Sequence, residues 1–484
     1  MAALLLLVLS AVGSLPLKGE DWPMLGRDRS RNAVSPEKGA PLEWDLGTGR
    51  SVLWSTPLGD ITTSQPVVAD GLVWVGTNLG RELGLKETEP TGVLLCFRAR
   101  DGERLYHHAA TPAPSAAARR RAEFGATASP VVQGDRLWFV TVAAEVLCLD
   151  IGPLQRGEGP PRQVWSRDLV REYGVFPSVD VMGGKGQCSL TAPLRDLLHV
   201  VTGTGADWSR TRFPSPEAPS LVCLNKDTGA PVWKDASPGT NAVYGEFGHP
   251  LVMDLHGVPQ VVAPQGDGWV RSFHAETGEL LWKLDINIRP VRRPWERNFF
   301  LNTPVHHGGR VFVAAGSEVE MGDGPGLVVC LDPSQRGEFR IGAGRDAGGG
   351  ADARGVVWAN DTVGRCLASP VIHDGLVYCA EFGGTLRCLD AATGRELWKH
   401  DLGAHIWATP LVVDSKVYLG DEDGDLEILE HGREKKLVFS GFFHAPLYAP
   451  AVFANGVLYI ASNERLYALR QGARSKPIPG LQRR

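Results

Sequence analysis

Hydrophobic and polar positions alternate in short runs along the chain, and these runs recur in units of similar length. The clearest units are three consecutive segments, Leu367–Leu402, Trp407–Ser440 and Tyr448–Gly472. Each has an apolar run after a proline, a polar turn, a second run, another turn and a third run, and the first two segments add a fourth, aromatic-bearing run. Alternation over so few residues predicts strands. Four short strands in about 40 residues is the size of one β-propeller blade.

The same template extends back through the chain and gives eight units. The prolines that open them are Pro66, Pro130, Pro193, Pro250, Pro304, Pro370, Pro410 and Pro450. The third run of each unit has a small or aliphatic residue at a fixed position: Cys96, Cys148, Cys223, Ser272, Cys330, Cys388, Ile428 and Ala468. The fourth run carries an aromatic residue: Tyr106, Trp165, Trp233, Trp282, Trp358, Trp398 and Phe439.

The eighth unit has no fourth run before the chain ends, whereas a strand-like run around Trp54 precedes the first unit. We expect this N-terminal strand to complete the last blade, because closing the ring removes free sheet edges. The predicted fold is all-β, an eight-bladed β-propeller of four-stranded antiparallel blades. We expect the repeated aromatic residues to pack between neighbouring blades.

The predicted organisation is a single propeller over residues 18–471, with a polar C-terminal tail at 472–484. Residues 1–17 form a signal peptide or an N-terminal apolar segment; the run at 2–9 is too short to span a membrane but suits a signal-peptide core. A buried N-terminal strand is the alternative. Export is the favoured interpretation, which gives a periplasmic or secreted protein that is not transmembrane once processed.

Composition agrees with this interpretation. The chain has 484 residues with 58 Gly and 34 Pro, which the repeat uses as turn and strand-opening residues. The formal net charge is −5, so no strong positive field points to nucleic acid as the partner. We expect a monomer.

The cysteines follow the repeat. Five of the eight occupy the third-run position, which predicts small buried strand residues and no metal ligands. If Gly383-Gly384 forms a two-residue turn, Cys379 and Cys388 face each other across a hairpin. A cross-strand disulfide and two packed thiols both remain open, with packed thiols favoured.

The repeat resembles the pyrroloquinoline-quinone (PQQ) repeat, in its S-P-V-V, V-Y-V and L-x-C-L-D-x-x-T-G-x-x-x-W pattern. The segment Asp21–Arg27, followed by Asn32–Ser35, is similar to the start of PQQ-binding-like propellers of exported bacterial proteins. That family includes PQQ-dependent dehydrogenases and the non-enzymatic assembly factor BamB. A resemblance to the dehydrogenases would imply PQQ and Ca²⁺ as cofactors. The dehydrogenases usually carry adjacent cysteines over the quinone, and this chain has no such pair.

Long connections concentrate on one predicted face, which places candidate binding residues there. The residues that precede each first strand should point toward the ring axis. These candidates for a small polar ligand are Lys185, Gln187, Glu246, His249, Asn302, Arg365, His405, Trp407 and His444. A water-filled channel lined by solvated groups is the alternative. Glu246 is the candidate catalytic carboxylate if the protein is an enzyme.

A second candidate is a basic patch for a protein partner, formed by Arg289, Arg292, Arg293, Trp295 and Arg297. Arginine binds carboxylates through paired hydrogen bonds, which suits an acidic partner. A solvated loop with unpaired arginines is an equal alternative. No metal site is assigned: Asp421–Asp425 is interpreted as a tight turn, and His107-His108 and His306-His307 are poor chelates because neighbours on a strand point apart.

The favoured function is an exported, BamB-like binding or scaffold module whose partners are proteins or a small polar ligand. The alternative is a PQQ- and Ca²⁺-dependent dehydrogenase that oxidises alcohols or sugars.

Overall fold

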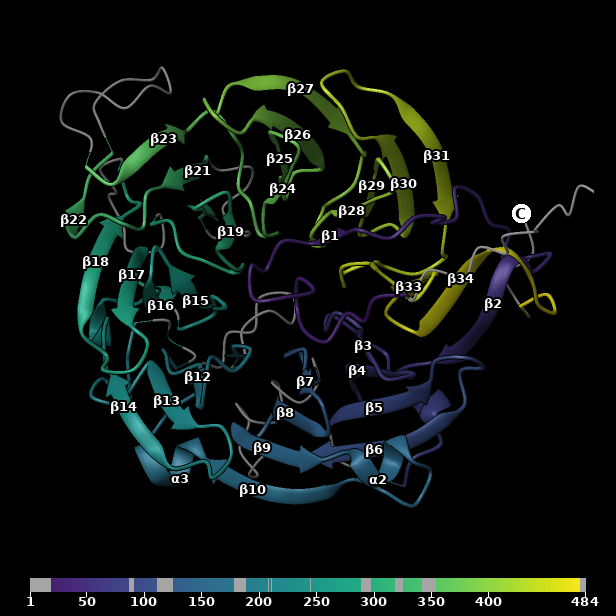
Figure 1. The fold of residues 1–484 in the computed structure, drawn as a ribbon, viewed down its shortest axis with the longest axis horizontal. Coiled ribbons are helices and arrows are strands. Elements are labelled where there is room, and N and C mark those ends of the chain that lie inside the picture. Colours follow the sequence, from purple (N-terminus) through teal and green to yellow (C-terminus); the bar gives the residue numbers. More distant parts are fainter. Residues whose placement is uncertain are drawn as a thin grey trace, which may run out of the picture.

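The computed structural model shows a closed ring of eight β-sheets around a central axis (Figure 1). It describes residues 19–86, 91–110, 125–177, 189–207, 209, 211–243, 245–288, 297–317, 325–341 and 354–478. Each sheet is an antiparallel, four-stranded blade whose first strand lies nearest the axis, and two blades gain a fifth, parallel strand. The predicted fold class is confirmed.

The first four blades are built from consecutive strands. Blade 1 contains β3 (Val67–Ala69), β4 (Leu72–Asn78), β5 (Gly92–Arg98) and β6 (Arg104–Ala110). Blade 2 contains β7 (Val131–Gln133), β8 (Arg136–Val140), β9 (Glu145–Asp150) and β10 (Arg162–Asp168). Blade 3 contains β11 (Ser189–Leu190), β12 (Leu197–Val201), β13 (Leu221–Asn225) and β14 (Pro231–Asp235). Blade 4 contains β15 (Leu251–Leu255), β16 (Val258–Pro264), β17 (Trp269–His274) and β18 (Leu280–Asp285), with β22 (Gly337–Phe339) added beside β18.

The last four blades follow the same plan. Blade 5 contains β19 (Val305–His307), β20 (Arg310–Gly316), β21 (Gly326–Leu331) and β23 (Val356–Asn360). Blade 6 contains β24 (Val371–His373), β25 (Leu376–Ala380), β26 (Thr385–Asp390) and β27 (Glu396–Asp401). Blade 7 contains β28 (Leu411–Val413), β29 (Lys416–Gly420), β30 (Asp425–Glu430) and β31 (Leu437–Phe442), with β1 (Val34–Ser35) added beside β28. Blade 8 contains β32 (Val452–Ala454), β33 (Val457–Ala461) and β34 (Arg465–Arg474), and its outer strand is β2 (Arg50–Pro57).

The ring closes as predicted, because β2 from the N-terminal part of the chain pairs with β34 at the other end. Trp54 lies opposite Ala468 in this pair. The strand β34 continues to Arg474, three residues into the segment that the sequence assigns to the C-terminal tail. The ring therefore joins both ends of the chain in one sheet.

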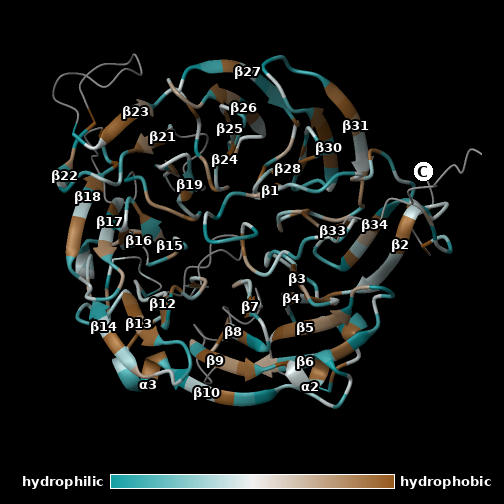
Figure 2. Cartoon of the chain, viewed as in Figure 1, coloured by the Kyte–Doolittle hydropathy of each residue, from teal (hydrophilic) through white to brown (hydrophobic). Residues whose placement is uncertain are grey.

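Helical structure is limited to single turns in the described residues. These turns are η1 (Arg81–Leu83), α2 (Gly152–Gln155), α3 (Leu169–Tyr173) and η3 (Gly239–Asn241). None of the helices in the described part of the chain is long and apolar enough to cross a membrane. Figure 2 shows apolar residues recurring along the strands of every blade, as expected for sheets packed face to face around a ring.

The third-run residue and the fourth-run aromatic of each unit are cross-strand partners in all eight blades. The pairs are Cys96–Tyr106, Cys148–Trp165, Cys223–Trp233, Ser272–Trp282, Cys330–Trp358, Cys388–Trp398, Ile428–Phe439 and Ala468–Trp54. Five of the indoles also donate Nε1–H to a backbone carbonyl of the next blade: Trp54 to Ala99, Trp165 to Lys226, Trp233 to Ala275, Trp358 to Ala391 and Trp398 to Gly432. The aromatic residues therefore join neighbouring blades, as predicted.

Two details of the predicted repeat are wrong. Pro193 does not open the third unit, because β11 ends at Leu190 and Pro193 lies in the turn that follows. The hairpin of blade 6 is shifted by one residue: Cys388 pairs with Tyr378, and Cys379 pairs with Arg387. This register puts the two thiols on opposite faces of the blade, so they are free, buried cysteines in two separate apolar clusters.

Candidate functional site

The axis of the ring is crossed by an N-terminal strap, defined here as Asp21–Glu37. Trp22 bridges Val68 in blade 1, and the Pro23 carbonyl accepts the Val132 N–H from blade 2. Further hydrogen bonds or strand pairing join the strap to blades 3, 5, 6, 7 and 8. Figure 1 shows this purple segment running through the middle of the ring. The strap therefore links seven of the eight blades at their inner strands.

Two buried side chains hold the strap. Asn32 makes a paired hydrogen bond with the backbone of Ile372, with Nδ2 donating to the carbonyl at 2.6 Å and the Ile372 N–H donating to Oδ1 at 2.9 Å. Arg31 is 3% exposed and donates to the carbonyls of Leu25 and Leu190. Burial lowers the pKa of Arg31 to about 10.

An aromatic and aliphatic cluster lies where the chain enters the inner strands of blades 4 to 8. Its buried members are Val243, Phe247, Phe299, Leu301, Leu367, Phe382 and Trp407, and Tyr448 packs against them. The Trp407 ring meets Phe382 edge-on at 5.0 Å between centroids and contacts Tyr448 at 5.7 Å. Its indole N–H donates to Glu422 Oε2 at 2.8 Å. Apolar side chains thus fill a part of the axis where the sequence places a polar funnel.

Glu246, the candidate catalytic carboxylate, is buried beside this cluster. Its side chain is 2% exposed, and both carboxylate oxygens accept the N–H of Gly266 at 3.2–3.3 Å. Burial, followed by the negative charge of Asp267, raises the pKa of Glu246 well above its ordinary value. Burial thus favours the neutral form of this carboxyl.

The other predicted funnel residues differ in exposure. Asn302 and Arg365 are buried; Asn302 Nδ2 donates to the carbonyls of Cys366 and Ala368, and Arg365 lies 5.8 Å above the Phe382 ring. His249 is half-buried, and His405 and His444 are exposed. Lys185 and Gln187 lie outside the described residues. The structure thus separates this set into buried side chains and more exposed imidazoles, and ligand binding by them stays a prediction.

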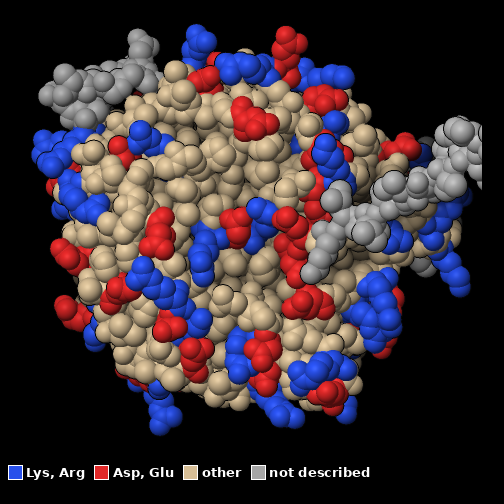
Figure 3. All heavy atoms as spheres, viewed as in Figure 1, with Lys and Arg blue, Asp and Glu red and all other residues tan. Residues whose placement is uncertain are grey.

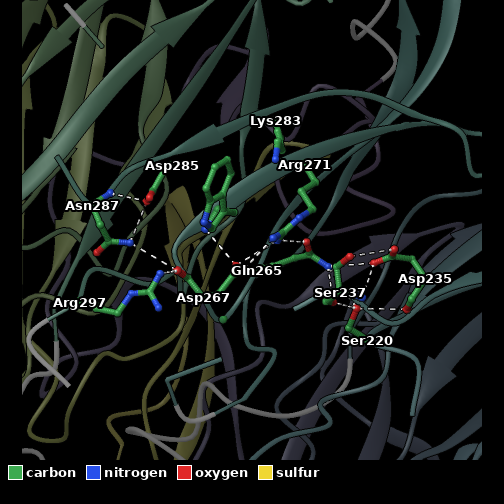
Figure 4. Close-up of polar contacts among 12 residues, drawn as sticks. Ser220, Asp235, Ser237, Gln265, Asp267, Arg271, Lys283, Asp285, Asn287 and Arg297 are labelled. Atoms are coloured by element: carbon green, nitrogen blue, oxygen red, sulfur yellow. Dashed lines mark hydrogen bonds and ion pairs between the residues drawn. The ribbon is translucent and has the colours of Figure 1, made fainter. Parts of the chain in front are cut away.

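A dense polar network lies in blade 4, near the end of the basic patch that the sequence predicts. Asp267 and Arg271 form two parallel hydrogen bonds of 2.7 and 3.0 Å between carboxylate and guanidinium. Gln265 accepts from Arg271 and donates to Ser220 Oγ (Figure 4). Paired geometry of this kind fixes both side chains.

Arg297 is the one member of the predicted basic patch within the described residues, and Arg289, Arg292, Arg293 and Trp295 lie outside them. Arg297 Nη2 donates to the carbonyl of Asp267 at 2.7 Å, as Figure 4 shows. The nearby Trp269 has Lys283 Nζ at 4.7 Å and the Arg271 guanidinium at 5.6 Å from its ring centroid. Two cations thus lie close to one half-buried indole.

The charges on the visible face of the molecule are mixed. Figure 3 shows acidic and basic side chains interspersed over this face, with no broad area of one sign. Recognition there would depend on local side-chain pairs, because interspersed charges of both signs cancel at a distance.

The acidic turn Asp421–Asp425 behaves as the sequence predicts. Asp421 Oδ1 accepts the backbone N–H groups of Asp423, Gly424 and Asp425, each at 3.0 Å. Gly424 has φ +98°, so the turn needs a glycine there. The carboxylate caps a hairpin loop.

Comparison with known proteins places the repeat in a family. Residues 349–435 match the family model described as outer membrane protein assembly factor BamB, a PQQ-repeat model. The chain is a PQQ-repeat β-propeller. A comparison with curated proteins gave no match.

Two solved structures share the fold of this PQQ-repeat propeller, and a third is similar at a lower score. BamB from Moraxella catarrhalis has a TM-score of 0.58 at 15% identity, covering 87% of this chain and 99% of that chain. The computationally designed Ika8 protein has a TM-score of 0.50 at 12% identity, covering 87% and 99%. A quinohemoprotein alcohol dehydrogenase from Comamonas testosteroni has a TM-score of 0.48 at 14% identity, covering 95% and 82%.

The described residues near the axis do not gather the set of oxygen ligands that Ca²⁺ takes. Calcium takes six to eight oxygen ligands. Near the axis, Asn302 Oδ1 is buried without a hydrogen-bond partner, but the Glu246 carboxylate faces a backbone amide. No group of three His, Cys, Asp or Glu side chains converges at the axis within the described ranges.

Sequence reasoning missed the two features that fill the axis. The sequence indicates the strap residues only as a motif similar to that of a known family. Nothing in their pattern predicts that Asn32 forms hydrogen bonds with a strand 340 positions away. A signal for the aromatic and aliphatic cluster was present, since Phe247, Leu301, Leu367 and Trp407 each lie three residues before the proline that opens their unit. Their shared position in the repeat predicts that they meet at the axis.

Proposed function

We propose that this PQQ-repeat propeller is an exported binding or scaffold module that holds a protein partner on its loop-rich face. This face carries the connections between blades and the loops between second and third strands. The family model that matches the repeat is described as an outer-membrane assembly factor, which makes proteins the expected partner class.

The burial of Glu246 is the observation that carries the proposal. The carboxylate best placed for chemistry is 2% exposed and hydrogen-bonded to the Gly266 amide, beside a cluster that includes Phe247 and Trp407. A ligand that approaches along the axis from this side meets packed side chains. Contacts on the loops around them then become the available means of recognition.

The blade 4 network supports a protein partner. Trp269 is half-buried near Lys283 and Arg271, and tryptophan and arginine are enriched at the centres of protein interfaces. The Asp267–Arg271 pair makes the surrounding surface rigid, which lowers the entropic cost of binding.

The test is capture of envelope proteins by the immobilised, full-length chain, with bound proteins identified by mass spectrometry. Changing Arg292 and Arg293 together to Glu should abolish capture of a specific partner. The matched control is Arg100→Glu with Arg470→Glu, the same charge change on two exposed arginines of the opposite face. Equal loss in both double variants would overturn the assignment of the loop-rich face.

A second measurement addresses the enzymatic alternative. The protein is incubated with PQQ and Ca²⁺, and dye-linked oxidation of alcohols and sugars is followed. Turnover that Glu246→Gln abolishes would overturn the scaffold proposal. Export is tested separately with an alkaline phosphatase fusion, since that reporter is active only outside the cytoplasm.

A further inference from the structure

Three metal-ligating side chains converge on the face opposite the loop-rich one, at the junction of blades 6 and 7. His373 and Asp374 lie at the turn between β24 and β25, and His431 lies between β30 and β31. Asp374 Oδ2 is 3.4 Å from His373 Nε2 and 3.7 Å from His431 Nε2. The three ligand atoms all lie within 4.8 Å of one another. We propose that His373, Asp374 and His431 bind a divalent transition-metal ion of the zinc type.

The distances fit a tetrahedral ion. Zinc takes histidine nitrogens and carboxylate oxygens at about 2.0–2.2 Å, which puts two ligands of a tetrahedron about 3.4 Å apart. The two distances from the Asp374 oxygen match this spacing closely. Nitrogen ligands also favour zinc, cobalt or nickel over calcium and magnesium, which prefer oxygen.

The hydrogen bond behind His431 leaves the correct nitrogen free. Its Nδ1 is 2.8 Å from Tyr378 Oη, and the same hydroxyl accepts the Gly432 N–H at 3.2 Å. In the tautomer that donates Nδ1–H to this hydroxyl, His431 Nε2 carries no proton and faces Asp374. A fixed tautomer of this kind is typical of metal-ligating histidine.

The propeller repeat does not need these imidazoles. His431 hydrogen-bonds through its backbone N–H to the turn between the first and second strands of its blade, as Ala99, Ala275 and Ala391 do in theirs. His373 ends its first strand where Ala69 and Ala454 end theirs. Other blades have alanine at both positions, so the propeller fold does not require a histidine at either one.

The ion would have an open coordination position. His373 is 33% exposed and borders a pocket of about 500 Å³, which Asp28 of the strap, His307 and Asp414 also line. Three protein ligands plus an open position describe zinc sites that bind a further ligand. The site would also join blades 6 and 7 through one ion.

The experiment uses the full-length, tag-free protein freed of metal with a chelator. We expect calorimetry with ZnCl₂ to give one ion per chain, and Co²⁺ to give the intense visible absorption of tetrahedral coordination. Asp374→Asn and His431→Ala should each weaken Zn²⁺ binding by about 10- to 100-fold. His431→Ala should fold, since alanine occupies that position in other blades.

The control is His107→Ala, which removes an exposed histidine in blade 1 and should leave Zn²⁺ affinity unchanged. Metal-free melting temperatures check that the variants are folded. Zn²⁺ affinity that is the same in wild type, Asp374→Asn and His431→Ala would overturn the proposal, as would the absence of binding to the folded wild type. The three residues would then form only an ion-paired turn.

Discussion

Gly394 lies directly against the indole of Trp358 in the neighbouring blade. A Cβ on Gly394 would sit 2.4 Å from Trp358 Cε3, and the residue has φ +72°. The same contact joins Gly102 to Trp54, Gly229 to Trp165 and Gly278 to Trp233. The Thr-Gly and Asp-Gly turns of the repeat thus have two physical reasons for glycine: the left-handed backbone and the close indole.

These two reasons can be separated by mutation. Gly394→Ala should lower the free energy of unfolding by about 2–4 kcal/mol, from backbone strain plus overpacking against the indole. Gly375→Ala should cost only about 1–2 kcal/mol, because Gly375 has φ +75° but nothing within 4 Å of its Cβ position. Urea unfolding of both variants checks the difference. Equal losses would show that the indole contact contributes nothing.

The Asn32–Ile372 hydrogen bonds should anchor the strap. Asn32→Ala leaves a buried N–H and a buried carbonyl of Ile372 without partners, and we expect a loss of about 2–4 kcal/mol. Limited proteolysis should then cut first within the strap. Asn241→Ala, at an exposed asparagine, is the control and should change stability by less than about 0.5 kcal/mol. Unaltered proteolysis of Asn32→Ala would mean that the strap is held elsewhere.

His199 should make the protein lose stability in acid. Burial lowers the pKa of His199 in blade 3 to about 4, from an ordinary value of 6.5. The unfolded chain therefore binds a proton between pH 6.5 and 4 that the folded chain does not, and stability falls by about 3 kcal/mol as pH drops through that window. His199→Gln should remove this part of the pH dependence, measured by urea unfolding from pH 7 to pH 4.

The control for that series is His107→Gln, an exposed histidine whose replacement should leave the pH profile as in wild type. A profile for His199→Gln that matches wild type would show that other groups cause the acid sensitivity.

Glu246 should destabilise the protein as pH rises. Burial raises the pKa of Glu246 in the folded protein. Above the ordinary pKa of a glutamate, the unfolded chain therefore releases a proton that the folded chain keeps. Glu246→Gln should therefore match or exceed the wild-type stability at pH 7, and its advantage should grow with pH. Thermal melting between pH 5 and pH 9 measures this.

Glu381→Gln is the contrasting control, because the Glu381 carboxylate is 7% exposed and paired with Arg387. Removing its charge should lower stability at pH 7. Loss of stability in Glu246→Gln of similar size would mean that Glu246 is also charged in the folded protein.

The repeat made the fold predictable from sequence. Trp358, Cys330 and their counterparts occupy fixed positions in every unit, and a local pattern of strands, turns and aromatic residues is enough to define a blade. Closure by the strand around Trp54 followed from counting strands. The register of the Cys379–Cys388 hairpin did not, because a shift of one residue in the pairing puts the two thiols on opposite faces without altering the hydrophobic pattern.

The candidate site was harder to predict, because its contacts join segments that are distant in sequence. The sequence by itself determined the eight blades, the inter-blade aromatic residues and the glycine turns, since each depends on residues within one unit or two neighbouring units. Only the tertiary structure decided that the strap crosses the axis, that Glu246 is buried, and that His373 and His431 meet across two blades. Ring closure brings these groups together, and no local pattern records which side chains will meet at a shared axis or junction.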